Sequence, residues 1–234
     1  MAIELKQHYV AFLDILGFTA MVGSDVTSEK QPHLGKLFRC HQSAGNIFKD
    51  DPHCTVTQFS DSIVVAKPFE VNGFEWFATK VAEYQRLLLD EGLICRGGIA
   101  VNKHFSNGTF TFSAGLIDAY LVESTVARFP RVVVSRDLID LIYPDQDEYP
   151  KFLIKEDDGF VFVDYLGLFK DQGSEKLTTS IGEIVAGLTA SKEPSLREKG
   201  MWLSSYSDAV LGTELTPPRF TGGNIEKGVG GQLK

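Results

Sequence analysis

Two apolar stretches, AFLDILGF at Ala11–Phe18 and QFSDSIVVA at Gln58–Ala66, each carry one acidic residue, Asp14 in the first and Asp61 in the second. A carboxylate inside an apolar strand is costly to bury, and it usually has a cation as its partner. Two such carboxylates on neighbouring strands would form a site for Mg²⁺ or Mn²⁺, which take oxygen ligands and bind nucleotide phosphates beside one or two protein carboxylates. The pattern therefore indicates a metal site that handles nucleotides.

Composition limits the possible partners. The chain has 234 residues, of which 43% are hydrophobic, and a formal net charge of −8. This length suits one sizeable domain, or a domain with an appended element. The negative charge argues against a nucleic-acid polymer or an anionic membrane as partner, because such surfaces attract an excess of Lys and Arg. The amino-terminal segment resembles neither a signal peptide nor a spanning helix, which predicts a cytoplasmic protein.

The cysteines do not suggest a disulfide framework. Cys40, Cys54 and Cys95 are scattered and odd in number, as in a reducing compartment. The adjacent pairs Cys40-His41 and His53-Cys54 lack the gap that separates most paired zinc ligands. We expect three buried or idle thiols, without a disulfide or a zinc site.

Hydrophobic periodicity predicts a mixture of strands and helices in which Asp61 lies at the tip of a hairpin. Strands are expected at 9–14, 55–59, 62–66, 93–101, 109–112, 131–135, 152–154 and 160–163, and helices from 18, over 33–48, over 73–90 and from 115. This order is typical of an α+β, ferredoxin-like or palm-type domain with a mostly antiparallel central sheet and surrounding helices. It does not fit a doubly wound nucleotide fold.

Four stretches, FLDILGF, FSDS, CRGGIAV and SAGLIDAYLVES, in this order and spacing, resemble the class III nucleotidyl cyclases, and most of all the bacterial Pycsar pyrimidine cyclases of anti-phage defence. The resemblance covers about residues 9–169 and implies a catalytic domain over 7–170. It implies a lyase that converts UTP or CTP to 3′,5′-cyclic UMP or cyclic CMP and pyrophosphate, with cyclic UMP slightly favoured. It also implies two Mg²⁺ or Mn²⁺ ions per site, a homodimer, and a separate effector that senses the product.

Carried over by position, the resemblance makes Asp14, Asp61 and the Ile15 carbonyl the metal ligands and the two acids catalytic. Taken alone, Asp14 fits a strand-end or helix-capping carboxylate equally well. Asp61 alone fits an ordinary turn aspartate. The two acids together, each in an apolar frame and in the order of the family, favour the metal site.

The resemblance assigns the triphosphate to the residues that follow Asp14. They lie where a strand turns into a helix, and the amides at a helix N-terminus bind phosphate. Gly17, at the turn from strand to helix, allows the backbone to come close to a ligand. The chain has no G-x-G-x-x-G motif, so this interpretation depends on the two acids. The expected phosphate-binding residues are Leu16, Gly17, Phe18 and Thr19.

Arg96 lies in an otherwise apolar strand, where it could pair with a structural carboxylate or contact the phosphates or base of a substrate; we include it among the catalytic residues. The neighbouring Gly97 and Gly98 indicate close packing or a bulge.

Thr57 is expected to contact the base. Purine-specific class III cyclases resemble one another in having Lys or Glu four residues before the hairpin acid, and this chain has Thr57 there. The absence of both charged side chains favours a smaller pyrimidine. A hydroxyl can donate and accept, so Thr57 does not separate UTP from CTP, and a β-branched strand residue is an equal alternative.

Two positions depart from the family. Many class III cyclases have Asn and Arg in a helix similar to LIDAYLVES, where this chain has Ile117 and Leu121. Either another cation, with Arg96, Lys103 and His104 as candidates, stabilises the developing charge, or the domain is a silent nucleotide-binding or dimerisation module. The Pycsar branch is similar to this chain in that helix, which favours activity. A purine cyclase is a further alternative.

The remainder of the chain is less diagnostic. Residues 171–215 predict a helical extension whose apolar stripe covers the core or a partner subunit, and residues 216–234 are rich in Gly and Pro, as in a flexible tail.

Overall fold

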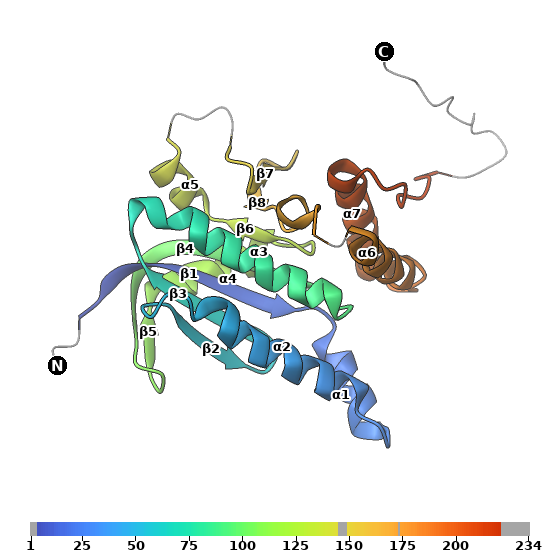
Figure 1. Cartoon of the computed structure of the whole chain (residues 1–234), viewed down its shortest axis with the longest axis horizontal. Helices are drawn as coiled ribbons and strands as arrows, with labels where there is room; N and C mark the ends of the chain where they lie inside the picture. The colour runs from blue at the N-terminus through green and yellow to red at the C-terminus, as the bar shows by residue number, and fades with distance from the viewer. Residues whose placement is uncertain (1–3, 145–148, 173, 221–234) are drawn as a thin grey trace, which may run out of the picture.

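The computed structural model describes residues 4–144, 149–172 and 174–220; most of the predicted flexible tail lies outside the described residues. In the part described, eight strands form one sheet in the order β2-β3-β1-β4-β6-β8-β7, with β5 paired to β4 (Figure 1). All neighbouring pairs are antiparallel except β4 and β6. The α+β fold is therefore confirmed. The strands are β1 (Lys6–Ile15), β2 (Thr55–Phe59), β3 (Ser62–Pro68), β4 (Cys95–Ser106), β5 (Thr111–Ser113), β6 (Val132–Val134), β7 (Leu153–Lys155) and β8 (Val161–Val163).

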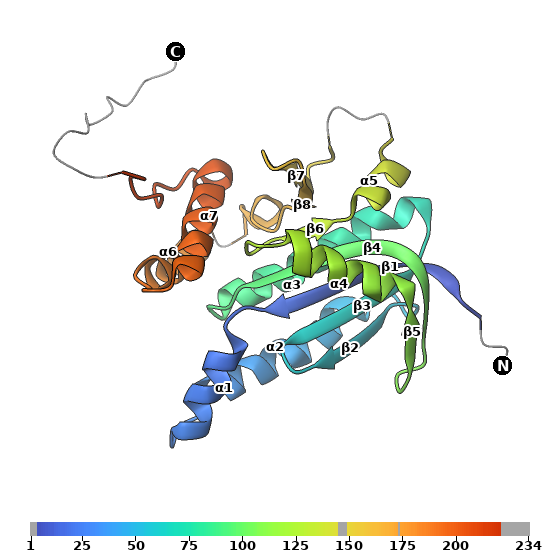
Figure 2. The ribbon, with the colours of Figure 1, turned by 180° about the vertical axis from the view of Figure 1, so that it is seen from behind.

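Helices cover the two faces of the sheet unequally. Figure 1 shows α2 (Pro32–Phe48) and α3 (Phe74–Asp90) on one face, and Figure 2 shows α4 (Ala114–Val126) on the other, over β1 and β4. Along β1, Tyr9, Ala11 and Leu13 belong to the large core cluster, while Val10 and Phe12 belong to the smaller cluster beside α4. Because side chains alternate along a strand, Asp14 points to the α4 face.

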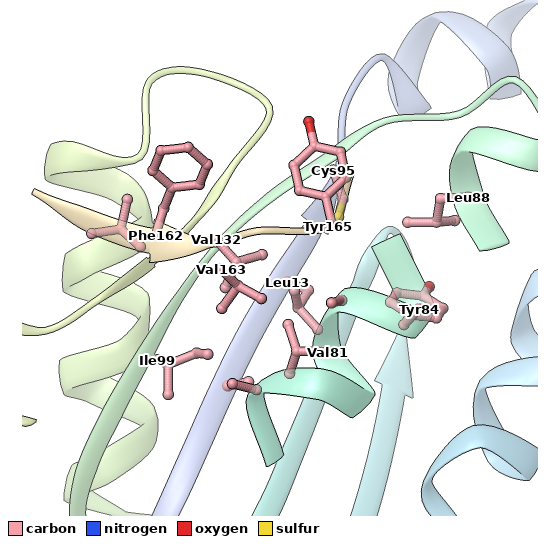
Figure 3. Packing of buried hydrophobic residues seen from close by; sticks show 14 of the residues in the cluster. Leu13, Val81, Tyr84, Leu88, Cys95, Ile99, Val132, Phe162, Val163 and Tyr165 are labelled. Atoms are coloured by element: carbon pink, nitrogen blue, oxygen red, sulfur yellow. The ribbon is translucent and has the colours of Figure 1, made fainter. Parts of the chain in front are cut away.

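The large core joins distant segments of the chain. Figure 3 shows Leu13 of β1, Val81 of α3 and Val163 of β8 gathered in one cluster, and all three are fully buried. The three cysteines are free, with Cys40 and Cys95 buried and Cys54 half-buried, as expected. None of the helices in the ranges described is long and apolar enough to cross a membrane.

Gly98 of β4 allows α4 to lie directly on the sheet, and Gly97 allows close contact between β4 and β1. A Cβ atom on Gly98 would be 2.2 Å from the carbonyl oxygen of Ala119 in α4, and one on Gly97 would be 2.5 Å from the carbonyl oxygen of Phe12. Both distances are far below van der Waals contact. The close packing predicted for these glycines is confirmed.

Some predicted boundaries were wrong. Helix α5 (Arg136–Ile142) was not predicted, because seven residues are too few for a clear periodicity; it begins after Ser135, whose hydroxyl accepts a hydrogen bond from the Leu138 amide. Strand β5 begins later than expected, because the Asn107 side chain accepts hydrogen bonds from the Thr109 and Phe110 amides and extends the turn. Helix α1 (Phe18–Thr27) begins as predicted.

The carboxyl-terminal helices, α6 (Ser174–Thr189) and α7 (Pro194–Leu211), lie side by side at one end of the sheet in both views (Figures 1 and 2). The Trp202 indole of α7 donates a 2.7 Å hydrogen bond to Glu156, and the Tyr206 hydroxyl donates a 2.6 Å bond to Asp164. Leu203 and Tyr206 are buried in the main core. The apolar stripe of α7 therefore covers the core, one of the two uses expected for it.

The substitution Gly98→Ala tests the contact between α4 and β4. The new methyl group would press on the α4 backbone, and we expect a loss of ~3 kcal/mol in the free energy of unfolding. Gly45→Ala in α2 is the control, since its Cβ would meet no atom within 4 Å and alanine favours a helix. Urea denaturation monitored by circular dichroism measures both variants; equal stability of the two would contradict the packing argument.

Candidate functional site

The two predicted acids lie together at one end of the sheet. Asp14 is the next-to-last residue of β1 and pairs in register with Ser62 of β3, which directly follows Asp61. The Ile15 amide donates a 3.0 Å hydrogen bond to the Asp61 carbonyl oxygen. This bond fixes the tip of the β2–β3 hairpin beside the end of β1.

The hairpin tip has a strained backbone. Among the described residues, Ser60 is the only non-glycine residue with a left-handed backbone conformation, at φ 55°. Such a conformation costs on the order of 1 kcal/mol and persists where the surrounding structure enforces it. Here the strained turn places the following residue, Asp61, beside Asp14.

Arg96 and Glu123 complete the charged group. Arg96 of β4 pairs in register with Asp14, and its Nε atom lies 3.5 Å from Asp14 Oδ2 and 2.6 Å from Glu123 Oε1. The Glu123 side chain comes from α4 and is 3% exposed. Sequence reasoning missed Glu123. One signal in the sequence could have indicated it. Glu123 follows Ala119 by one helical turn, and Ala119 packs directly on Gly98 of the sheet.

The site holds more negative than positive charge. Burial raises the pKa of Asp14, and the neighbouring Asp61 carboxylate raises it further, while Arg96 opposes the shift. Burial also raises the pKa of Glu123, with Arg96 again opposing. Arg96 pairs with Asp14 and Glu123, and the Asp61 carboxylate also repels Asp14, so a cation would relieve this repulsion.

The donor set fits a hard divalent cation. Asp14, Asp61 and the carbonyl of Ile15 could supply oxygen ligands, which Mg²⁺ and Mn²⁺ prefer. Within the described ranges, no group of three or more His, Cys, Asp or Glu side chains forms a complete metal cage. Mg²⁺ is often bound by one or two carboxylates together with substrate phosphates, so two acids suffice for such a site.

The segment after β1 has the backbone that a phosphate cradle needs. Gly17 has φ 84° and precedes α1, which begins without a side-chain cap, so the first amides of the helix are open to a ligand. The Leu16 amide donates a 2.9 Å hydrogen bond to the Ile94 carbonyl. Among the described residues, the amides of Gly17, Phe18 and Thr19 have no such backbone partner.

Thr57 points to the same face of the sheet as Asp14. It lies on the edge strand β2 opposite Val64, which belongs to the cluster beside α4, and it is half-buried. Because paired residues of antiparallel strands point to the same side, Thr57 and Asp14 face the same way. Two inter-strand spacings separate β2 from β1, roughly 10 Å.

The other candidate cations lie elsewhere. His104 pairs with Lys6 at the far end of β4, about 26 Å along the strand from Arg96. Burial and the nearby His8 lower the pKa of His104 to about 4, so it is neutral at physiological pH. Lys103 is its neighbour at the same end. Of these three candidates, only Arg96 adjoins Asp14 in the same chain.

Ile117 and Leu121, the two residues at the positions where many class III cyclases have Asn and Arg, lie on the outer side of α4. Ile117 is 61% exposed and Leu121 49%, and Tyr120 between them is 51% exposed, with its ring edge on Phe12. These side chains form an apolar surface next to the charged group and do not take part in it.

Comparison with known proteins identifies the architecture. No family model matches the sequence, and no curated protein matches it either. A solved structure of the guanylyl cyclase domain of the RhoGC fusion protein from the aquatic fungus Blastocladiella emersonii, in monomeric form, matches with a TM-score of 0.53 at 13% identity, covering 68% of this chain and 95% of that one. The fold is that of a nucleotidyl cyclase domain.

Two further cyclase structures are similar. The dimeric form of the same fungal domain matches with a TM-score of 0.51 at 16% identity, covering 68% of this chain and 96% of that one. The adenylyl cyclase CyaB from P. aeruginosa matches with a TM-score of 0.47 at 17% identity, covering 70% and 97%. The two matches to the fungal domain span nearly all of that domain but 68% of this chain, so this chain has residues beyond the matched part.

The raised pKa of Asp14 makes stability depend on pH. The native protein holds this proton more tightly than the unfolded chain, so stability falls as the pH rises from the ordinary carboxyl pKa of 3.8 through the raised value. In metal-free buffer at pH 7.5, Asp14→Asn should therefore melt a few degrees above the wild type. Glu183→Gln, which removes an exposed carboxylate of α6, should leave the melting temperature unchanged. A lower Tm for Asp14→Asn would contradict the repulsion inferred here.

Proposed function

We propose that this chain is a pyrimidine nucleotide cyclase that converts UTP or CTP to the 3′,5′-cyclic monophosphate and pyrophosphate. The observation that carries this proposal is the Asp14–Asp61 pair, with its surplus of negative charge, at the end of the sheet of a cyclase fold. In the reaction the substrate 3′-oxygen forms a bond to the α-phosphorus and loses its proton. The bond between the α-phosphorus and the bridging oxygen breaks, and pyrophosphate leaves.

Each part of the site has a role in this chemistry. Two Mg²⁺ or Mn²⁺ ions held by Asp14, Asp61 and the Ile15 carbonyl would neutralise the triphosphate and lower the pKa of the 3′-hydroxyl. The Phe18 and Thr19 amides receive phosphate oxygens at the start of α1. Arg96, held by Glu123, places a fixed positive charge beside the acids and offsets charge that develops on the phosphates.

Base selection rests on Thr57. Its short, neutral side chain on the open face leaves room for a pyrimidine and offers one hydroxyl to the base edge. The alternative is a purine cyclase, and the fold matches favour it in one respect: the matched fungal domain is a guanylyl cyclase by name. Both alternatives use the same carboxylates and differ only in the nucleotide.

A homodimer suits the open face of the sheet. Large apolar side chains gather on α4 and near it, and monomeric proteins rarely expose so many together. The exposed residues are Phe59, Phe112, Ile117, Tyr120 and Leu121. A second copy of the chain would cover these side chains, and Phe59 belongs to the same hairpin as Asp61. From the sequence resemblance, we further propose that the cyclic product signals to a separate effector in antiviral defence.

The reaction is tested by incubating the purified protein with Mn²⁺ and each of ATP, GTP, CTP and UTP, and identifying products by chromatography and mass spectrometry. We expect cyclic UMP or cyclic CMP, and a loss of ~1000-fold or more in Asp14→Ala and Asp61→Ala, which remove metal ligands. Circular dichroism confirms that the variants are folded. A cyclic purine would contradict the pyrimidine assignment, and no product from folded, dimeric protein would contradict the cyclase.

Thr57→Lys tests the base contact. If Thr57 meets the base, the new charge should change the ratio of kcat/KM between pyrimidine and purine triphosphates by about tenfold, with the Mn²⁺ dependence unchanged. Thr55→Lys is the matched control, because Thr55 lies on the same strand and side but farther from the hairpin tip. Equal ratios in both variants and the wild type would show that Thr57 is only a strand residue.

A further inference from the structure

A second, cationic cavity adjoins the carboxylate site. It has a volume of about 220 Å³ and lies where α7 meets the start of β4 and the end of α4; its lining residues are Arg96, Arg128, Phe129, Ser195, Glu198 and Lys199. Arg96 belongs to both places, because its Nε atom is also 3.5 Å from Asp14 Oδ2. The cavity therefore adjoins the carboxylate site through Arg96, on the side of the carboxyl-terminal helices.

Helix α7 presents Lys199 from a fixed position. Trp202 and Tyr206 follow it by three and seven residues, so the three side chains share one face of the helix. Both aromatic residues are anchored: the Trp202 ring stacks on Phe129 at 5.7 Å, and Tyr206 bonds to Asp164. Lys199 is thus held against the cyclase fold by a helix that is part of the core.

Lys199 lacks a direct counterion, unlike the other two cations of the cavity. Arg128 pairs with Glu198 at 3.2 Å, and Arg96 with Glu123 at 2.6 Å. In the part of the chain described, no ion pair includes Lys199, and its Nζ atom donates a 3.3 Å hydrogen bond to the Ser195 carbonyl. Burial lowers the pKa of Lys199, and Arg96 and Arg128 lower it further, against partial compensation by Glu198 and Glu193. A bound anion would supply the missing charge.

We propose that Lys199, together with Arg96 and Arg128, binds the terminal phosphates of the nucleoside triphosphate, so that α7 completes the site. The identity of the ligand rests on the proposed function. Arg96 lies beside Asp14 and also lines this cavity, so a triphosphate bound at the acids would reach Lys199 where its β- and γ-phosphates extend past Arg96. A lysine ammonium is a compact charge with three donors, which suits phosphate oxygens. The same group would hold the product pyrophosphate.

The test uses the full chain and a probe without base or ribose. Isothermal titration calorimetry with magnesium tripolyphosphate should give a Kd about tenfold weaker for Lys199→Gln than for the wild type. Lys199→Arg, which keeps the charge, should recover most of the affinity. Lys192→Gln is the matched control, since it removes the same charge from an exposed position just before α7. Magnesium pyrophosphate and orthophosphate, titrated in parallel, show whether two linked phosphates suffice.

A second measurement separates this inference from the proposed function. In the cyclase assay, Lys199→Gln should raise KM for the triphosphate about tenfold and change kcat less. If no nucleotide is cyclised but tripolyphosphate binding depends on Lys199, the proposed function fails and the polyphosphate site stands. If cyclic product forms while KM and the tripolyphosphate Kd of Lys199→Gln equal those of the wild type, this inference is overturned. Wild-type protein that does not bind tripolyphosphate also overturns it.

Discussion

The contact between α4 and Gly98 of β4 sets the chemistry of the site. With Gly98 directly beneath Ala119, the helix lies close enough to place Glu123 against Arg96, in a position almost closed to water. Arg96 is then shared between Glu123 and Asp14, and it cannot balance both of these acids and Asp61. Burial raises the pKa of Asp14, the neighbouring Asp61 carboxylate raises it further, and Arg96 opposes the shift, so a cation would relieve the remaining repulsion.

The parts of this site that the sequence could predict are the local ones. Asp14 and Asp61 each interrupt a short apolar strand, and the hairpin between β2 and β3 follows from its residue pattern, so the proximity of the two acids could be predicted. The position of Glu123 could not, because its burial depends on a contact between segments distant in sequence. The hydrogen bond from the Leu16 amide to the Ile94 carbonyl could not be predicted for the same reason, since Ile94 precedes another strand.

The carboxyl-terminal helices pack against the core at one end of the sheet. Sequence periodicity predicted the apolar stripe of α7 but not its position, which depends on two polar anchors at Glu156 and Asp164. These anchors place Lys199 beside Arg96, at the edge of the carboxylate site. The open face beside α4 carries exposed apolar side chains near the same site, so a second subunit and α7 would enclose the nucleotide from different sides.

We propose that Asp14 and Asp61 together hold divalent metal for a bound triphosphate. This is tested by Mn²⁺ binding, followed by electron paramagnetic resonance, in the presence of 3′-deoxy-UTP or 3′-deoxy-CTP, which lack the attacking hydroxyl. We expect two Mn²⁺ ions per chain in the wild type, and a marked loss of affinity in both Asp14→Asn and Asp61→Asn. Equal Mn²⁺ binding by the wild type and both variants would contradict this proposal.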